Sequence, residues 1–281
     1  MRPLWRPVRG IESSRLHEAR LQAHHAVQWL ARAARAFVPP QPDDSHTSLG
    51  WEDARGGFVT HPLTGDVRLG LRLADLTLLL DGAHGEGSLP LDGRTDADAR
   101  RWLGERLPAY GLDAGGLDAK APYEIPAHAV AHGGAYGAGG LADALAELAA
   151  WFANADGALG GVRRQMIARG LAASPVRCWP HHFDMATLTP LEGGDAEHAR
   201  SVNVGLSPGD EHYDEPYFYV SPYPYPQPAQ LPPLPAPGHW HVRGFTAAIA
   251  PASRIVKTAD HQAAVTAFLE AAVAAAIKAL R

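Results

Sequence analysis

The chain opens with a segment whose apolar residues recur at the spacing of a helix. Over residues 12–38, leucine, valine and alanine return at roughly helical intervals, which predicts one long helix. Ser13 or Ser14 can cap its start. Pro39-Pro40 ends it, because proline disfavours helical geometry at the residue before it.

A strand-rich segment follows this helix. Its clearest part is 67–81, where apolar residues alternate with polar or small ones before the apolar run at 76–80. Asp81-Gly82 is typical of a turn. Thr95 has the features of a helix cap, with acidic residues after it, and this helix ends at Gly111. Shorter strands are predicted at 45–52, 57–63 and 87–91.

The second half repeats this order after a connector at 112–140 that is rich in glycine and proline. A helix is predicted at 141–155, with an extension over 159–170 after a break at Gly160-Gly161. Thr258 caps a closing helix with one apolar face. The predicted strands between these helices are 176–189, 201–206, 217–220 and 242–250.

These patterns predict an α+β fold of two topologically similar halves, each consisting of a helix, about four antiparallel strands and a helix. The expected boundaries are 1–111 for the N-terminal half, 112–140 for the connector and 141–281 for the C-terminal half.

A proline-rich insertion at 216–237 lies within the C-terminal half. Its proline density favours extended polyproline geometry and excludes a central strand. The simpler interpretation is a rigid connection over the surface. The more specific hypothesis is a lid over a neighbouring site, with Tyr223 and Tyr225 pointing inward.

Composition and charge exclude several classes of protein. Lys and Arg number 25 against 30 Asp and Glu, a net charge of -5, so a global basic footprint for nucleic acid is absent. A hydrophobic fraction of 46% excludes a disordered chain, and the apolar run at 76–80 is too short to cross a bilayer. A single cysteine, Cys178, excludes an intramolecular disulfide, and residues 1–10 lack the apolar region of a signal peptide. We expect a cytoplasmic protein of unknown oligomeric state that binds a small molecule, and neither nucleic acid nor membrane.

Two segments carry a resemblance to a known family. Ser174-Pro175-Val176 precedes Phe183-Asp184-Met185-Ala186 by six residues, and Pro216-Tyr217-Phe218-Tyr219-Val220 follows later. Both resemble segments of a bacterial family that is catalogued only as a domain of unknown function. The resemblance is densest over 174–280 and implies a similar α+β fold of two related halves, without implying an activity. It differs at His181-His182, where family members carry small residues.

Histidine and acidic residues concentrate in three segments, 179–184, 209–215 and 238–241. Side chains two apart on a strand share a face, so His182 and Asp184 would point together, as would His239 and His241. Two such pairs on neighbouring strands would bring imidazole and carboxylate groups to one centre. That donor set suits a divalent metal such as Zn, Fe or Mn.

Further residues of these segments would complete the site. Glu211 or Glu215 would act as a general base on a metal-bound water. The remaining candidates would line a substrate pocket: Trp179, His181, His212, Tyr217, Tyr219 and Trp240.

The leading functional hypothesis is a small-molecule enzyme, with a metal-dependent hydrolase as its specific form. A metal-free polar pocket built from the same residues is an equal alternative, and purely structural roles are a third. An alternative of a different class is a non-catalytic protein whose aromatic pocket binds a small molecule or a partner protein. The tyrosine-proline tract could itself dock a partner.

Two other motifs are rejected as sites. The string Gly205-Leu206-Ser207-Pro208-Gly209 matches G-x-S-x-G, but Pro208 has no N–H to donate to an oxyanion. Cys178 reads as a small buried residue rather than a nucleophile. The histidines of the first helix, His17, His24 and His25, are expected to be structural.

Overall fold

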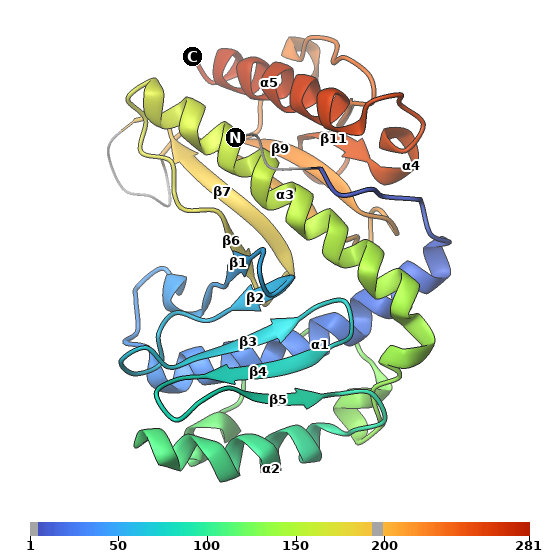
Figure 1. The fold of residues 1–281 in the computed structure, drawn as a ribbon. Coiled ribbons are helices and arrows are strands. Elements are labelled where there is room, and N and C mark those ends of the chain that lie inside the picture. Colours follow the sequence, from blue (N-terminus) through green and yellow to red (C-terminus); the bar gives the residue numbers. More distant parts are fainter. Residues whose placement is uncertain (1–4, 193–198) are drawn as a thin grey trace. The chain divides into compact units, whose positions relative to one another are not determined.

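The computed structural model describes residues 5–192 and 199–281, which form two compact units (Figure 1). The N-terminal unit comprises Ile11–Ala149 and Arg177–Phe183, and the C-terminal unit comprises Met1–Gly10, Ala150–Val176 and Asp184–Arg281. Each unit contains an antiparallel sheet with helices, which confirms the predicted α+β class. The expected connector at 112–140 lies inside the N-terminal unit, and 177–183 joins that unit from the second half of the sequence.

The sheet of the N-terminal unit is a meander of five strands in the order β1-β2-β3-β4-β5, where about four were predicted. Its helices are α1 (Ser13–Phe37) and α2 (Asp96–Arg106), and its strands are β1 (Gly50–Glu52), β2 (Gly57–Val59), β3 (Arg68–Arg72), β4 (Thr77–Asp81), β5 (Gly87–Pro90) and β6 (Arg177–Trp179). Its 3-10 turns are η1 (Ser45–Thr47), η2 (Leu107–Tyr110), η3 (Ala114–Asp118), η4 (Ala129–His132) and η5 (Ala138–Leu141).

The long strand predicted at 67–81 is a hairpin. Leu69 pairs with Leu80 and Leu71 with Leu78 across β3 and β4. Leu76 lies in the connecting turn with φ 48°. The paired leucines of β3 and β4 therefore lie on one face of the hairpin. The face of β3 that carries its leucines packs against α1.

Of the caps predicted for α1 and α2, the structure confirms the one at α2. Thr95 caps α2 as expected: its side chain accepts from the backbone N–H of Asp98, whose carboxylate accepts from the N–H of Thr95 at 2.9 Å. The prediction for α1 is wrong. Its N-cap is Glu12, which makes no side-chain capping bond, so Ser13 and Ser14 lie within the helix.

In the C-terminal unit the strands run in the order β10-β11-β9-β8-β7, all antiparallel. The last β-strands thus depart from a simple meander, because β9 pairs with β11 and not with β10. The elements are α3 (Ala142–Ala168, whose first residues belong to the N-terminal unit), β7 (Asp184–Pro190), β8 (Ser201–Ser207), β9 (Tyr217–Tyr223), η6 (Pro228–Gln230), β10 (His239–His241), β11 (Ala247–Pro251), α4 (Ala252–Ile255) and α5 (His261–Ala279).

The strand predicted at 176–189 is interrupted by a turn. The backbone N–H groups of His182 and Phe183 both donate to the carbonyl of Trp179, at 3.2 and 2.7 Å. Phe183 has φ 59°, outside strand geometry. Because β7 begins only at Asp184, the two-residue alternation that paired His182 with Asp184 does not apply across this turn.

Two further boundaries differ from prediction. α3 continues through Gly160-Gly161 without a break, because the flanking Leu159 and Val162 are buried in the core and hold the helix. The strand predicted at 242–250 begins only at Ala247, as β11, because residues 242–246 form the connection from β10, in which Gly244 has φ 81°.

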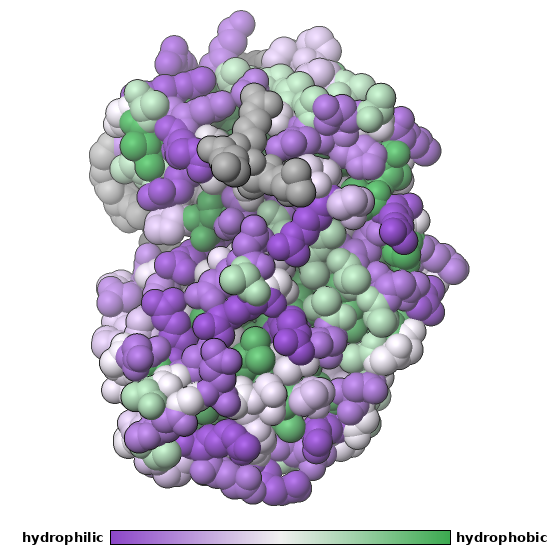
Figure 2. Space-filling model, in the orientation of Figure 1, coloured by the Kyte–Doolittle hydropathy of each residue, from purple (hydrophilic) through white to green (hydrophobic). Residues whose placement is uncertain are grey.

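The last helix, α5, begins at a cap other than the predicted Thr258. The Asp260 side chain accepts from the N–H of Ala263 at 2.9 Å. Among the described residues, α5 alone is long and apolar enough to cross a membrane by length and composition. Its buried residues, including Phe268 and Leu269, belong to the core of the unit, and the helix contacts β8, β9 and β11. On the face seen in Figure 2, apolar residues are interspersed with hydrophilic ones.

The proline-rich insertion starts at Pro216, contains the whole of β9, and has no other regular structure among the described residues apart from η6. The prediction that this tract excludes a central strand is therefore wrong over 217–223, because β9 pairs with β11 on one side and β8 on the other. The side chains of Tyr223 and Tyr225 are among the large exposed ones, at 47% and 51% exposure. The inward orientation suggested for these two tyrosines is therefore wrong, because about half of each residue's surface is open to solvent.

The two faces of the C-terminal sheet have different partners. Phe218 is buried on one face, with its ring 6.5 Å from Trp5 and 6.4 Å from Trp151 of α3. Alternation along β9 places Tyr217 and Tyr219 on the opposite face. The helices thus cover one face, and the tyrosines lie on the other.

Gly205 allows Tyr219 to lie across β8. The two residues are directly opposite in the register of β8 and β9. A Cβ at Gly205 would lie 2.5 Å from the Tyr219 ring and 2.6 Å from the carbonyl oxygen of Met185. Only glycine leaves this space, so the ring can cross the strand and reach β7.

We predict that Gly205→Ala lowers the free energy of unfolding by about 1–3 kcal/mol, because the new methyl group forces an overpacked contact with Tyr219 and backbone. The control Gly140→Ala adds its methyl group in open space, and should change stability by less than about 0.5 kcal/mol. Urea denaturation of the full chain measures both. Equal free energies for the two variants would show that Tyr219 does not depend on Gly205.

Candidate functional site

The register of the C-terminal sheet brings several predicted site residues to the face opposite the helices. His239 pairs with Ile249, and Ile249 with Tyr219. Because directly paired residues share a face, His239, His241, Tyr217 and Tyr219 lie on the same one. Together with the preceding loop they form what we call the tyrosine–histidine cluster: Asp210, Tyr213, Tyr217, His239 and His241.

The hydroxyl of Tyr213 lies between the two imidazoles of β10. Its oxygen is 3.1 Å from Nε2 of His239 and 3.0 Å from Nδ1 of His241. A hydroxyl carries one hydrogen, so Tyr213 donates to one ring and accepts from the other when both are neutral. The sequence analysis predicted correctly that the two histidines point the same way, which is what this arrangement requires.

Two outer partners fix the direction of these hydrogen bonds. The carbonyl oxygen of Arg243 is 2.7 Å from Nε2 of His241 and can only accept, so in neutral His241 the Nδ1 atom accepts from Tyr213. Nη1 of Arg254 is 3.4 Å from Nδ1 of His239 and can only donate, so Nε2 of His239 donates to Tyr213. The result is a series of hydrogen bonds that all run in one direction. Arg254 donates to His239, His239 to Tyr213, Tyr213 to His241, and His241 to the carbonyl of Arg243.

Asp210 holds the loop that carries Tyr213. Its Oδ1 accepts from the backbone N–H groups of His212 and Tyr213, at 2.8 and 2.9 Å. Its Oδ2 accepts from the hydroxyl of Tyr217. This carboxylate therefore ties the loop to β9 and places the Tyr213 ring 5.0 Å from that of Tyr217.

The environment shifts the pKa of the groups in the cluster. Burial, then the nearby Arg254 and His241, lower the pKa of His239, while the backbone of Ile249 acts in the opposite direction. Burial and the Asp210 carboxylate raise the pKa of the Tyr213 hydroxyl, against a smaller effect of Arg254. His239 is thus kept neutral and Tyr213 protonated near pH 7, which suits a base and a proton donor.

Asp184 lies on the same face as the cluster, at the start of β7. The hydroxyl of Tyr219, having crossed Gly205, donates to its Oδ2 at 2.5 Å. Burial and this carboxylate raise the pKa of Tyr219 well above its usual value. The ring of Tyr219 is 6.2 Å from that of Tyr217, so polar groups continue across the sheet from β7 to β10.

The two predicted general bases lie elsewhere. Glu215 accepts from the backbone N–H and hydroxyl of Ser253 at the start of α4, at 2.5 and 2.9 Å. The side chain of Glu211 is 87% exposed, and its Oε1 is 3.5 Å from Nε2 of His212. In this structure Glu215 caps a short helix and Glu211 faces solvent.

Other predicted pocket residues have partners outside the cluster. Trp240 points to the face opposite its neighbours on β10, and its indole N–H donates to the carbonyl of Pro232 at 2.7 Å. The His212 ring packs 5.2 Å from Phe245 and 5.8 Å from His241, at the margin of the cluster.

The remaining predicted residues, Trp179, His181 and His182, belong to the N-terminal unit. The ring of His181 lies 6.0 Å from Trp179, 4.3 Å from His182 and 5.6 Å from Tyr123. Burial and His182 lower the pKa of His181. Their participation with Asp184, His239 and His241 in one site stays a prediction.

The proposed metal site also stays a prediction. Within the described ranges, no group of three or more His, Cys, Asp and Glu residues is arranged to hold a metal ion. The donors that do converge are His239, His241 and the phenol of Tyr213. They would hold a Zn, Fe or Mn ion only with a further ligand.

Two histidines of α1, His24 and His25, have carbonyl partners, as their expected structural role requires. Nε2 of His24 is 2.9 Å from the carbonyl oxygen of Pro180, and Nε2 of His25 is 2.9 Å from that of Pro126. Burial lowers the pKa of His24 to about 4, so its neutral ring fixes the turn that follows β6.

Sequence reasoning missed three residues of the site: Asp210, Tyr213 and Arg254. The first two lie in the segment singled out for its acidic residues and histidine, yet only Glu211, His212 and Glu215 were selected from it. A signal was present, because Asp210 two residues before His212 is typical of an Asx turn.

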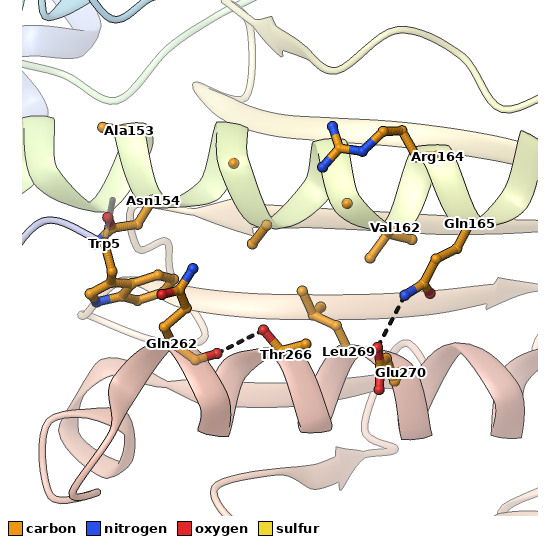
Figure 3. Close-up of a pocket in the computed structure, with 13 residues that line it drawn as sticks. Trp5, Ala153, Asn154, Val162, Arg164, Gln165, Gln262, Thr266, Leu269 and Glu270 are labelled. Carbon is orange, nitrogen blue, oxygen red and sulfur yellow. Dashed lines mark hydrogen bonds between the residues drawn. The ribbon is translucent and has the colours of Figure 1, made fainter. Parts of the chain in front are cut away.

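A separate pocket of about 190 Å³ lies between α3 and α5 (Figure 3). Trp5 lies at one end, and a 3.0 Å hydrogen bond from Gln165 to Glu270 spans the other. The indole nitrogen of Trp5 is buried without a hydrogen-bond partner among the described residues. A Cβ at Gly161 would meet only the Arg164 side chain, at 3.9 Å, so glycine keeps this space open.

The fold and the cluster define an α+β protein of two units, in which a sheet of the C-terminal unit presents polar chemistry on the face away from its helices. Residues 11–281 match the family of unknown function DUF5996, and the chain belongs to this family. Comparison with curated proteins and with solved structures found no match.

We predict that the pKa of His239, measured by NMR titration, lies below its ordinary value of 6.5. Arg254→Gln should raise it, because removing a nearby positive charge favours the protonated imidazole. Lys257→Gln removes the same charge from an exposed position shortly after it and should leave the pKa unchanged. A wild-type pKa at or above 6.5 would contradict the arrangement described.

Proposed function

We propose that the protein is a small-molecule enzyme that uses the tyrosine–histidine cluster for acid–base catalysis, with hydrolysis of a small anionic substrate as its reaction. The observation that carries this proposal is the single Tyr213 hydroxyl bonded to both His239 and His241. A hydroxyl that accepts from one imidazole and donates to the other offers a path for proton transfer, which a purely structural contact does not need.

The hydrogen-bond directions define what each group would do. When Arg254 turns to the substrate, Nδ1 of His239 is free to take a proton from water, and this is matched by release of the proton on Nε2 to the Tyr213 oxygen. The proton of Tyr213 passes in the same step to Nδ1 of His241, which then carries the positive charge. The carbonyl of Arg243 stabilises that charge through Nε2. The hydroxide formed at His239 attacks the substrate.

Arg254 supports an anionic substrate. It is exposed beside His239 and pairs with no described carboxylate. Its guanidinium would bind a carboxylate or phosphate group of the substrate and so place the reacting bond next to Nδ1 of His239. The metal-dependent form of the enzyme would instead use His239 and His241 as ligands, and it predicts a different response to chelation.

We expect the protein to hydrolyse 4-nitrophenyl succinate or 4-nitrophenyl phosphate in the presence of EDTA, in preference to the neutral 4-nitrophenyl acetate. His239→Gln should lower kcat/KM by about 10²–10⁴, the usual contribution of a general base. His132→Gln, at an exposed histidine of the N-terminal unit, is the matched control and should have no effect.

Two results would overturn this assignment. Turnover of none of the three esters, or equal turnover by wild type and His239→Gln, would remove acid–base hydrolysis at the cluster. Activity that EDTA abolishes and Zn²⁺, Fe²⁺ or Mn²⁺ restores, with stoichiometric metal in the purified protein, would favour the metal-dependent hydrolase.

The pocket between α3 and α5 supports a second function, non-catalytic binding of a small molecule. Its specific observation is the buried, unpartnered indole N–H of Trp5. An unsatisfied buried donor costs about 1–3 kcal/mol, which a ligand oxygen would recover. Glycine within a helix costs about 1 kcal/mol, so Gly157 and Gly161 on the pocket wall are costly unless the space has a use.

We predict that benzamide and benzoate, which carry acceptor oxygens, move the indole N–H resonance of Trp5 downfield with saturation, and that benzylammonium does not. Gly161→Leu fills the pocket and should abolish the shift. Gly140→Leu, at an open position, should preserve it. An unsaturable shift, or one that persists in Gly161→Leu, would exclude this pocket as the binding site.

A further inference from the structure

A second polar face lies on the sheet of the N-terminal unit. Leu49 forms an antiparallel bridge with Cys178, which places β6 beside β1 (Figure 1). Both residues are fully buried. Their neighbours Gly50 and Arg177 therefore lie opposite one another on the other face of the sheet.

The same face continues across β2 and β3. Gly50 pairs with Val59, and this register places Ser48 opposite His61, with Ser48 Oγ 3.5 Å from Nε2 of His61. Thr60 donates its N–H to the carbonyl of Leu69, so His61 lies opposite Arg68. Since directly paired residues share a face, His61 and Arg68 lie on the side that carries Arg177. We call Ser48, His61, Arg68 and Arg177 the basic face.

Gly50 makes room for the Arg177 side chain. A Cβ at this position would lie 2.7 Å from Nη1 of Arg177. The guanidinium thus rests on the backbone of β1, and any other residue at 50 would displace it. Arg177 is held over the sheet by this contact, and it does not extend freely into solvent as surface arginines do.

The charges on this face do not balance. Glu52 and Asp81 both pair with Arg55, and Glu52 also lies 3.6 Å from Arg68. Arg177 is half-buried and pairs with no described carboxylate.

The groups beside Arg177 are the cation Arg68 and the imidazole of His61. Burial and the charge of Arg68 lower the pKa of Arg177. Burial, then Arg177, Arg68 and His46, lower the pKa of His61, against the backbone of Ser45. A partly buried cation beside a second cation is unfavourable unless an anion joins them.

We propose that the basic face is a binding site for a phosphate group, either inorganic phosphate or a phosphate carried by a small organic molecule. The fork of Arg177 matches two phosphate oxygens, while His61 and Arg68 reach the same group from the neighbouring strands. Trp179 lies two residues after Arg177 on β6 and offers its ring to the organic part of a phosphate ester. This site is separate from the tyrosine–histidine cluster and binds without proton transfer.

Isothermal titration with inorganic phosphate and with phenyl phosphate, at constant ionic strength in NaCl, tests the proposal. We expect saturable binding of both, tighter for phenyl phosphate. Arg177→Gln should weaken binding at least 10-fold. Gly50→Ala should weaken it also, because it displaces the guanidinium without changing the charge. Arg72→Gln removes one positive charge from the same sheet, where Arg72 pairs with Asp75, and should have no effect.

Thermal unfolding provides an independent measurement. Without phosphate, Arg177→Gln should unfold at the same temperature as the wild type or above it, because it removes an unpaired cation. Saturating phosphate should raise Tm of the wild type and not of Arg177→Gln. Absence of saturable binding, or equal affinity in Arg177→Gln and wild type, would overturn the proposal. Binding lost equally in Arg72→Gln would show nonspecific charge attraction and would also overturn it.

Discussion

A glycine beneath a long polar side chain is the constraint on which both polar faces depend. In the C-terminal unit, Gly205 leaves the space through which Tyr219 crosses β8 to bond Asp184. In the N-terminal unit, Gly50 leaves the space in which Arg177 lies over β1. Glycine weakens a strand, because it adds chain entropy to the unfolded state and packs no side chain. In each sheet the destabilising glycine lies where a side chain of the neighbouring strand, Tyr219 or Arg177, packs against the backbone.

In the tyrosine–histidine cluster, one carboxylate positions the hydroxyl that connects the two histidines of the face. Two histidines on β10 would be ordinary polar residues if each bonded a separate partner. Their shared partner, Tyr213, is placed by Asp210, which accepts from two backbone N–H groups of the loop and from Tyr217. One carboxylate therefore fixes the loop, orients a hydroxyl and keeps its pKa high. Loss of that carboxylate would leave the histidines in place but without a common hydrogen-bond partner.

The sequence predicted the features that depend on residues close together in the chain. The α+β class, the Thr95 cap and the common orientation of His239 and His241 follow from periodicities and caps within one segment. The strand alternation that placed His182 and Asp184 on one face does not hold, because a turn at 180–183 interrupts the strand. The position of Tyr213 depends on a side-chain contact from a loop. The basic face requires the register between residues 49 and 178, a pairing that nothing in the neighbouring sequence encodes.

The two faces differ in the kind of charge they hold, and this difference separates their chemistry. Burial keeps His239 neutral and Tyr213 protonated, so the cluster is able to move a proton without holding a permanent charge of its own. Arg177 stays cationic at any physiological pH, because even a lowered arginine pKa is far above neutrality. A permanent cation cannot serve as an acid or a base near pH 7, but it binds an anion throughout that range. The cluster is therefore the face suited to catalysis, and the basic face is suited to recognition.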